Sequence, residues 1–142
     1  MRPSPGAALL LALALTAACA HGPGVYDDEA GNWQRAFRTE RPSGVEVLRS
    51  QVVRLPSGGT LGWFRLRATP AREAELFAND LDPVPDREAK AVRADARGGP
   101  SWFAPEPVAR YAAWRTTKEL LPVILVFKDR ETGELFVHLR PR

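Results

Sequence analysis

Few residues of this chain have the type and spacing of a catalytic nucleophile with its base. The chain has one cysteine, Cys19, and two histidines, His21 and His138. It contains no G-x-S-x-G sequence, and Ser101 has no base close to it in the sequence. His138 stands between two apolar residues of an alternating segment, which favours a position on a sheet face over a role as general base. We therefore predict no catalytic residue and favour a protein that is not an enzyme.

Carboxylates offer two further kinds of chemistry, metal binding and glycoside hydrolysis. The sequence has no H-E-x-x-H, C-x-x-C or EF-hand spacing. Asp80, Asp82 and Asp86 could meet around Ca²⁺, but solvated carboxylates at a helix exit are the simpler interpretation. The glutamates available for an acid–base pair are Glu73, Glu75, Glu106, Glu131 and Glu134. No spacing among them singles out a pair, and we predict neither a metal nor a cofactor.

Aromatic residues beside arginines are the best binding signal in the chain. Interfaces are enriched in Trp, Tyr and Arg, and guanidinium groups stack on aromatic rings. The predicted binding surface consists of Trp63, Arg65, Arg67, Trp102, Arg110 and Trp114. The alternative is that the rings pack in the core of a small domain. Trp63 distinguishes the two, because it shares a strand face with two arginines.

The N-terminal residues have the parts of an export signal. Arg2 gives a positive start, and Ala7–Leu15 is an apolar run within the roughly 7–15 residues typical of a signal peptide. This run is too short to span a membrane, which takes about 20 apolar residues. The sequence Thr16-Ala17-Ala18-Cys19 follows. It resembles the lipobox of bacterial lipoproteins, in which the chain is cut before a cysteine that then carries fatty acyl chains such as palmitate.

This resemblance implies a signal peptide over residues 1–18 and a cell-envelope protein anchored to a membrane through lipid on Cys19. Ala20 after the cysteine resembles the sorting pattern of outer-membrane lipoproteins. The alternatives are a cytoplasmic protein or an ordinary secretory signal cut after Ala20, because Ala18-Cys19-Ala20 also fits A-x-A. Thr16 departs from the lipobox, where Leu, Val or Ile is favoured. The single cysteine favours lipidation, because an exported chain cannot build an internal disulfide from it.

Composition indicates one modest domain after the signal peptide. The formal net charge is only +3, and loss of Arg2 lowers it, so we predict no nucleic-acid partner. Gly22, Pro23 and Gly24 favour a flexible tether before the domain. The predicted organisation is a signal peptide over 1–18, the lipidated cysteine and tether over 19–31, and a single domain over 32–142 with a charged insertion near 82–100.

Alternating apolar residues predict two β-hairpins. One joins strands 45–54 and 61–68 through a Pro-Ser-Gly-Gly turn, and the other joins strands 123–127 and 135–139 through a turn with Gly133. In the first strand, Val45, Val47 and Val53 are expected on one side and Leu48 and Val52 on the other. Helices are expected over 33–38 behind an Asn32 cap, over 70–79 behind Thr69, over 87–96 and over 107–115.

The expected fold class is α+β, a small antiparallel sheet of about four strands with helices packed on one face. We expect a membrane-anchored envelope lipoprotein that acts as a non-catalytic binding module for a protein partner. The alternatives are an envelope hydrolase that uses carboxylates and a structural lipoprotein of a larger assembly. A flat surface around Trp63, Arg65 and Arg67 would favour binding, whereas a cleft with two carboxylates near His138 would favour hydrolysis.

Overall fold

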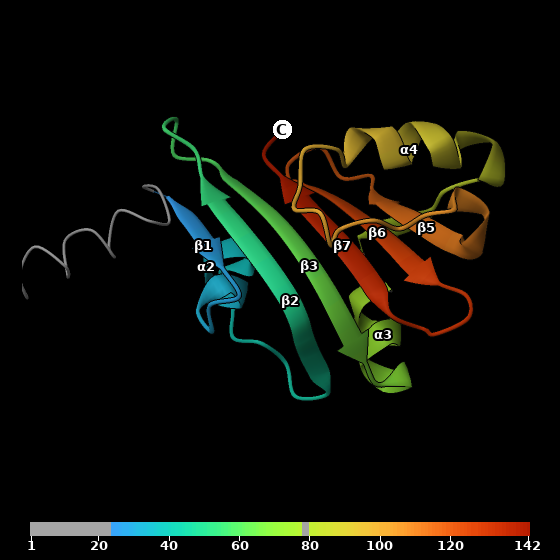
Figure 1. Cartoon of the computed structure of the whole chain (residues 1–142), viewed down its shortest axis with the longest axis horizontal. Helices are drawn as coiled ribbons and strands as arrows, with labels where there is room; N and C mark the ends of the chain where they lie inside the picture. Colours follow the sequence, from blue (N-terminus) through green and yellow to red (C-terminus); the bar gives the residue numbers. More distant parts are fainter. Residues whose placement is uncertain (1–23, 78–79) are drawn as a thin grey trace, which may run out of the picture.

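The computed structural model describes residues 24–77 and 80–142, which form a seven-stranded antiparallel sheet (Figure 1). The strand order is β1-β2-β3-β7-β6-β5-β4. The strands are β1 (Val25–Asp27), β2 (Val45–Arg54), β3 (Thr60–Ala68), β4 (Leu81–Pro83), β5 (Tyr111–Thr116), β6 (Val123–Asp129) and β7 (Leu135–Arg140). The predicted signal peptide and Cys19 lie outside the described residues.

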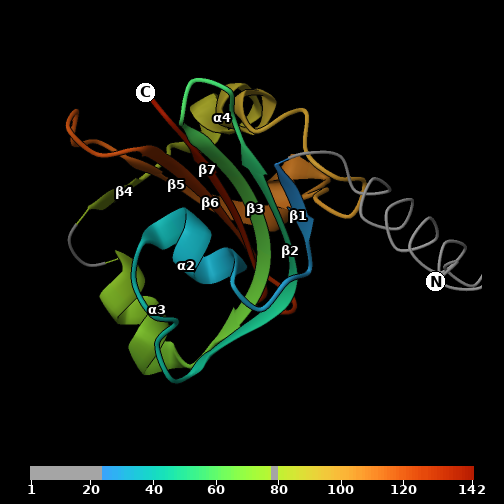
Figure 2. The same cartoon turned by 90° about the vertical axis from the view of Figure 1, so that its left-hand side faces the viewer.

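Helices lie on both faces of this sheet (Figure 2). The helices α2 (Asn32–Phe37) and α3 (Pro70–Phe77) lie on one face, and α4 (Ala89–Asp95) lies on the other. The 3₁₀ turn η1 (Asp86–Glu88) leads into α4, and η2 (Val108–Arg110) leads into β5. We call the two sides of the sheet the α2 face and the α4 face. Among the described residues, no helix is long and apolar enough to cross a membrane.

Each face carries its own hydrophobic core, because the central strands are apolar on both sides. The α2-face core consists of Trp33, Ala36, Val45, Val52, Phe64, Leu66, Val126, Leu135 and Val137. The α4-face core consists of Trp63, Val84, Val92, Ala96, Phe103, Tyr111, Ala113, Leu125, Phe127 and Phe136.

The two predicted hairpins are confirmed, and they join into one sheet. β2 pairs with β3, and β6 pairs with β7, both antiparallel. β7 then pairs with β3, with Trp63 opposite His138 and Phe64 opposite Val137. The helix predicted behind Thr69 is confirmed as well, and the Arg72 backbone N–H donates to Thr69 Oγ1 at 3.4 Å.

The prediction of four strands with helices on one face is wrong, because the sheet has three further strands and is covered on both sides. β1 and β4 contain three residues each, too few to show alternation. β1 lies within residues 19–31, so three residues of the predicted tether, Val25–Asp27, belong to the sheet. β5 replaces most of the helix predicted over 107–115. β5 has two small alanines between Tyr111 and Trp114, so its sequence shows no clear alternation of apolar and polar side chains.

Residues 82–100, predicted as a charged insertion, contain part of β4 and the helix α4. Val92 is 3% exposed and Ala96 is 1% exposed, so this segment packs on the sheet. The small alanines give the helix an apolar side that the sequence pattern had attributed to Val92 alone.

The predicted facing of the β2 side chains is wrong, because the strand contains a β-bulge. The register shifts between Val47 and Arg49, so one extra residue lies in this strand. An extra residue exchanges the two faces for everything beyond it. Val45 and Val47 therefore share the α2 face with Val52, whereas Val53 packs against the α4-face core. The bulge also places Arg49 opposite Arg65, on the α4 face.

Asn32 opens α2, but its side chain does not cap the helix. It is 1% exposed, and its amide donates to the Tyr26 carbonyl and to Ser50 Oγ, both at 2.9 Å. A buried amide needs such partners. Asn32 therefore ties the start of α2 to β1 and β2.

Candidate interaction surface

The α4 face is divided into two halves. Over β5–β7 lie α4 and the segment 96–107 that follows it, and we call this the covered half (Figure 1). Phe103 of that segment is 4% exposed and packs edge-on against Phe127 and Phe136, with ring centroids 6.5 and 5.5 Å away. The segment is therefore held down by aromatic contacts.

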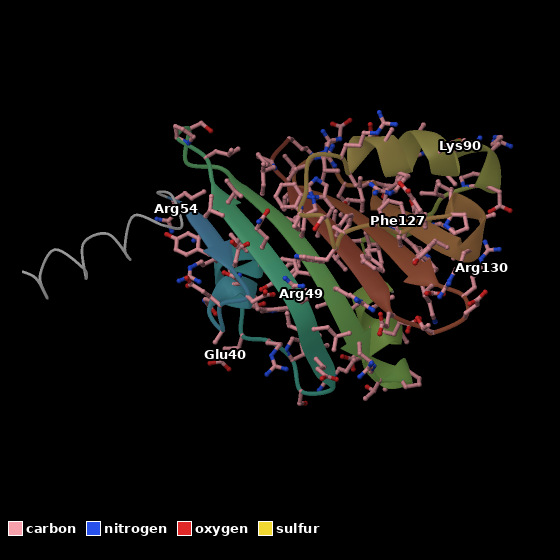
Figure 3. All side chains as sticks on the ribbon, in the orientation of Figure 1. Glu40, Arg49, Arg54, Lys90, Phe127 and Arg130 are labelled. Carbon is pink, nitrogen blue, oxygen red and sulfur yellow. The ribbon has the colours of Figure 1, made fainter. Side chains whose placement is uncertain are left out.

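No described helix lies over β1–β3 on the same face, and we call this the bare half, defined by Arg49, Gln51, Arg65 and Arg67. The strand register places these four side chains together, because Arg49 lies opposite Arg65 and residues two apart share a face. The exposed fractions of the arginine side chains are 46% for Arg49, 40% for Arg65 and 59% for Arg67. Figure 3 shows Arg49 on β2, well away from Phe127 in the covered half.

Ion pairs hold the arginines of the bare half in place. Arg65 donates from Nε to Glu134 Oε2 at 2.7 Å, and Arg67 lies 3.4 Å from the other oxygen of the same carboxylate. Arg67 also lies 3.3 Å from Glu46. Two guanidinium groups thus share Glu134, whose side chain is only 14% exposed. A guanidinium has five N–H donors, so this arrangement leaves donors for a partner's oxygens.

Trp102 forms the border between the two halves. It is half-buried, and the Arg49 guanidinium lies 5.3 Å from the centroid of its ring. A guanidinium over an aromatic ring is a favourable contact, and the Arg49 side chain stays accessible to solvent. The structure therefore brings Arg65, Arg67 and Trp102 of the predicted surface together, and it adds Arg49.

A hollow of about 280 Å³ opens at the edge of β2 beside the bare half, and Arg49, Glu46 and Asp28 are among its lining residues. Asp28 has a left-handed backbone (φ 49°), and its carboxylate accepts from the Ser50 N–H at 2.9 Å and from Arg49 Nε at 3.1 Å. Burial acts to raise the pKa of this carboxyl, but the bonds from Arg49 and Ser50 outweigh it and the pKa is lowered. The edge hollow thus keeps a fixed negative charge beside Arg49.

Trp63 lies beneath the border and is only 4% exposed, so it does not present its ring to a partner. Its indole stacks on His138 with ring centroids 4.9 Å apart. A Cβ on Gly99 would lie 2.5 Å from the indole nitrogen, so only a glycine lets the segment cross there. The Trp63 N–H has no hydrogen-bond partner among the described residues.

His138 is placed for packing and not for proton transfer. It is 2% exposed, and its Nδ1 lies 2.9 Å from the Gly62 carbonyl oxygen. Burial lowers the pKa of the imidazole, and the nearby charges of Arg140 and Arg93 lower it further. Nδ1 contacts this backbone carbonyl and not the carboxylate that would orient a catalytic base.

Arg110 and Trp114 of the predicted surface lie elsewhere. Arg110 donates to Asp129 from Nε at 2.9 Å and from Nη2 at 2.6 Å, and so it braces the turn between β6 and β7. These bonds lower the pKa of the Asp129 carboxyl and raise that of the guanidinium. Trp114 packs against the α2-face core, on the other side of the sheet.

The carboxylates considered for catalysis are each tied to a cation. Glu73 pairs with Lys128, Glu75 with Arg72, Glu106 with Arg93, Glu131 with Arg110, and Glu134 with Arg65 and Arg67. Within residues 24–77 and 80–142, no group of three or more His, Cys, Asp or Glu side chains could hold a metal ion.

The sequence did not predict Arg49 as part of the surface, because the face on which it lies depends on the bulge. Arg49 and Gln51 are two residues apart and so share a face, but the sequence does not show which face until the pairing with Arg65 is known.

Comparison of the chain with known protein families, curated proteins and solved structures finds no match.

Proposed function

We propose that this protein is a non-catalytic binding module for a protein partner and that the bare half of the α4 face is its docking surface. The observation that carries the proposal is that half of one sheet face is left without a covering helix and presents Arg49, Arg65 and Arg67 beside Trp102. Arginine and tryptophan are the residues that most often dominate binding energy in protein interfaces.

The arginines favour a partner surface that carries carboxylates. Arg65 and Arg67 share Glu134, so their remaining donors can form charge-assisted hydrogen bonds with a second carboxylate. The edge hollow, with Glu46 and Asp28 in its wall, can receive a polar side chain of the partner next to Arg49. Complementary charges of this kind set the orientation of a complex and the rate of its formation.

The N-terminal resemblance supplies the proposed location. We propose a lipoprotein of the bacterial cell envelope, anchored through Cys19, with the outer membrane as the favoured destination. Replacement of Cys19 by alanine followed by membrane fractionation tests the anchor. Membrane association that persists in this variant would remove the basis of the proposed location.

A hydrolase is less well supported, because His138 is buried with a lowered pKa and the glutamates are paired with cations. A structural lipoprotein of a larger assembly would use the same surface, and it differs only in whether the complex is permanent.

Copurification tests the docking surface. The full-length protein is solubilised from membranes in mild detergent, and copurifying proteins are identified by mass spectrometry. Arg67→Glu places a carboxylate beside Glu134 and Glu46, so recovery of the partner should fall at least about tenfold. The control is Arg87→Glu on η1, where the arginine is 83% exposed but lies outside the bare half. Equal recovery with both variants would contradict the proposal.

A further inference from the structure

A groove at the end of the molecule opposite to Arg54 gathers positively charged side chains. Figure 3 shows Lys90 of α4 and Arg130 of the turn between β6 and β7 at this end. The groove has a volume of about 480 Å³. Its lining includes Asp86, Arg87, Lys90, Val108, Ala109 and Arg130. We call it the cationic groove. None of the residues that define the bare half lines it, so it is independent of the proposed docking surface.

Backbone hydrogen bonds hold the walls of the cationic groove in place. The Val84 N–H, just before η1, donates to the Ala113 carbonyl of β5 at 2.8 Å. The Arg130 N–H donates to the carbonyl of Arg110, the last residue of η2, at 3.0 Å. Ala89 at the start of α4 also lines the groove and is only 8% exposed. The groove is therefore preformed, as ligand sites usually are, and its volume lies in their range of roughly 300–1,000 Å³.

Three cations and one carboxylate line the cationic groove, and two of the cations are poorly neutralised by their own surroundings. The Lys90 ammonium forms no ion pair or hydrogen bond with any group in the described part of the chain. Arg130 lies 3.6 Å from the Asp86 carboxylate, whose side chain is 92% exposed. This pair is long and solvated, so it holds neither side chain firmly.

Arg87, the third cation, is also left largely without a counter-charge. Its nearest carboxylate, that of Glu88, lies 4.0 Å away. The same carboxylate is bound by Arg115 at 2.8 Å and so is already neutralised. In the bare half, by contrast, Arg65 is paired with Glu134 at 2.6 Å. Like charges gathered in one groove attract anions and raise their local concentration.

We infer that the cationic groove binds a phosphate monoester group. Such a group carries a charge of about −1.5 to −2 at pH 7 and has three strong acceptor oxygens. This charge matches three cations beside one carboxylate, whereas a carboxylate ligand would neutralise only half of the excess. The guanidinium groups of Arg87 and Arg130 can each donate two parallel hydrogen bonds to phosphate oxygens, and Lys90 adds a point charge. Val108 and Ala109 offer apolar surface to the organic part of the ester.

NMR titration with phenyl phosphate tests this site. The full chain, isotopically labelled, is kept at low salt in an uncharged detergent that contains no phosphate. We expect saturable shifts in the amide signals of residues 86–90 and of Arg130. Benzoate, which has the same ring and a single negative charge, should bind at least about tenfold more weakly.

The same phosphate chemistry occurs on soluble molecules and on lipid headgroups, and vesicles distinguish these sources. The full chain with Cys19→Ala, which cannot carry a lipid on this residue, is sedimented with phosphatidylcholine vesicles that contain or lack phosphatidic acid. Sedimentation that depends on phosphatidic acid would assign the site to a lipid headgroup. Binding of phenyl phosphate without such sedimentation would assign it to a soluble ester. Failure of both would overturn the inference.

Charge reversal locates the bound phosphate. Lys90→Glu should reduce the affinity for phenyl phosphate at least about tenfold, because reversing a unit charge roughly 4 Å away has an effect of this order even in water. Arg130→Glu replaces it if the first variant does not fold, and Lys90→Arg should retain the affinity within about twofold. Arg54→Glu is the matched control, since it makes the same change of charge at an exposed arginine at the other end of the molecule. Equal losses in Lys90→Glu and Arg54→Glu would show attraction to net charge alone and refute the site.

Discussion

The covered and bare halves of the α4 face belong to one sheet but are held in different ways. In the covered half, Phe103 packs against Phe127 and Phe136, and the rings exclude water from β5–β7. In the bare half, Arg65 and Arg67 are partly exposed to solvent and are paired with Glu134. β3 crosses the border and contributes to both halves, since Trp63 belongs to the first and Arg65 to the second.

This difference shows which half supports the fold. Burial of an aromatic side chain stabilises a domain by several kcal/mol, whereas an exposed ion pair contributes about 0–1 kcal/mol. The arginines of the bare half therefore add little to stability. Their shared position on one face is the observation behind the proposed docking surface, and the contrast in stability between the two halves can be measured directly.

Phe103→Ala should have the largest effect, because it removes the ring that holds the segment 96–107 on the sheet. Truncation of a fully buried phenylalanine costs about 3–5 kcal/mol. We expect the free energy of unfolding, measured by urea denaturation, to fall by this amount. Trp102→Ala is the matched control, since its ring is half-buried at the border, and its loss should be clearly smaller. Equal losses would mean that the border lies elsewhere.

Acidification should weaken the covered half next. The folded pKa of His138 lies below its usual value of about 6.5, so between these two values only the unfolded chain takes up the proton. Stability should be unaffected by His138 above pH 6.5 and should fall below it, by up to about 1.4 kcal/mol per pH unit. Arg93 on α4 and Arg140 on β7 are the charged groups that oppose protonation, and Trp63 on β3 stacks on the ring.

The measurement is urea unfolding between pH 7 and pH 5, compared with His138→Phe, which keeps a ring against Trp63. This window lies above the range in which carboxylates such as Asp28 titrate. The difference in slope between the two proteins should vanish above pH 6.5. A slope that survives in His138→Phe would assign the pH dependence to another group.

Much of the fold could be predicted from patterns of at least five residues. The strands of both hairpins alternate or are continuously apolar over five or more residues, and Thr69-Pro70 marks the start of α3. β1 and β4 carry no such pattern, because they are held by pairing with β2 and β5 and not by their own residues. β5 was mistaken for a helix because Tyr111 and Trp114 are also spaced as on one helix face.

The residues of the candidate surface could be predicted from the sequence only in part. Arg65 and Arg67 were predicted together because they are two residues apart in one strand and so share a face. Trp63 obeys the same alternation, but its burial depends on a distant glycine, Gly99, that lets a segment cross above it. Arg49 depends on a bulge, and bulges have no reliable sequence signature. Position along a strand was therefore predictable, whereas coverage by remote segments was not.

Arg67→Ala should have the smallest effect on stability. Its guanidinium is 59% exposed and its contacts with Glu134 and Glu46 are 3.4 and 3.3 Å long, so we expect a change below about 0.5 kcal/mol. Arg93→Ala is the matched comparison, because it makes the same substitution on α4 in the covered half. Arg93 is 14% exposed and lies over the ring of Phe103, 5.8 Å from its centroid, so its loss removes packing as well as charge and should cost about 1 kcal/mol or more. Urea unfolding of the two variants side by side compares one residue type in both halves. If Arg67→Ala proved as costly as Arg93→Ala, the arginines of the bare half would have a structural role, and their exposure would no longer favour a partner.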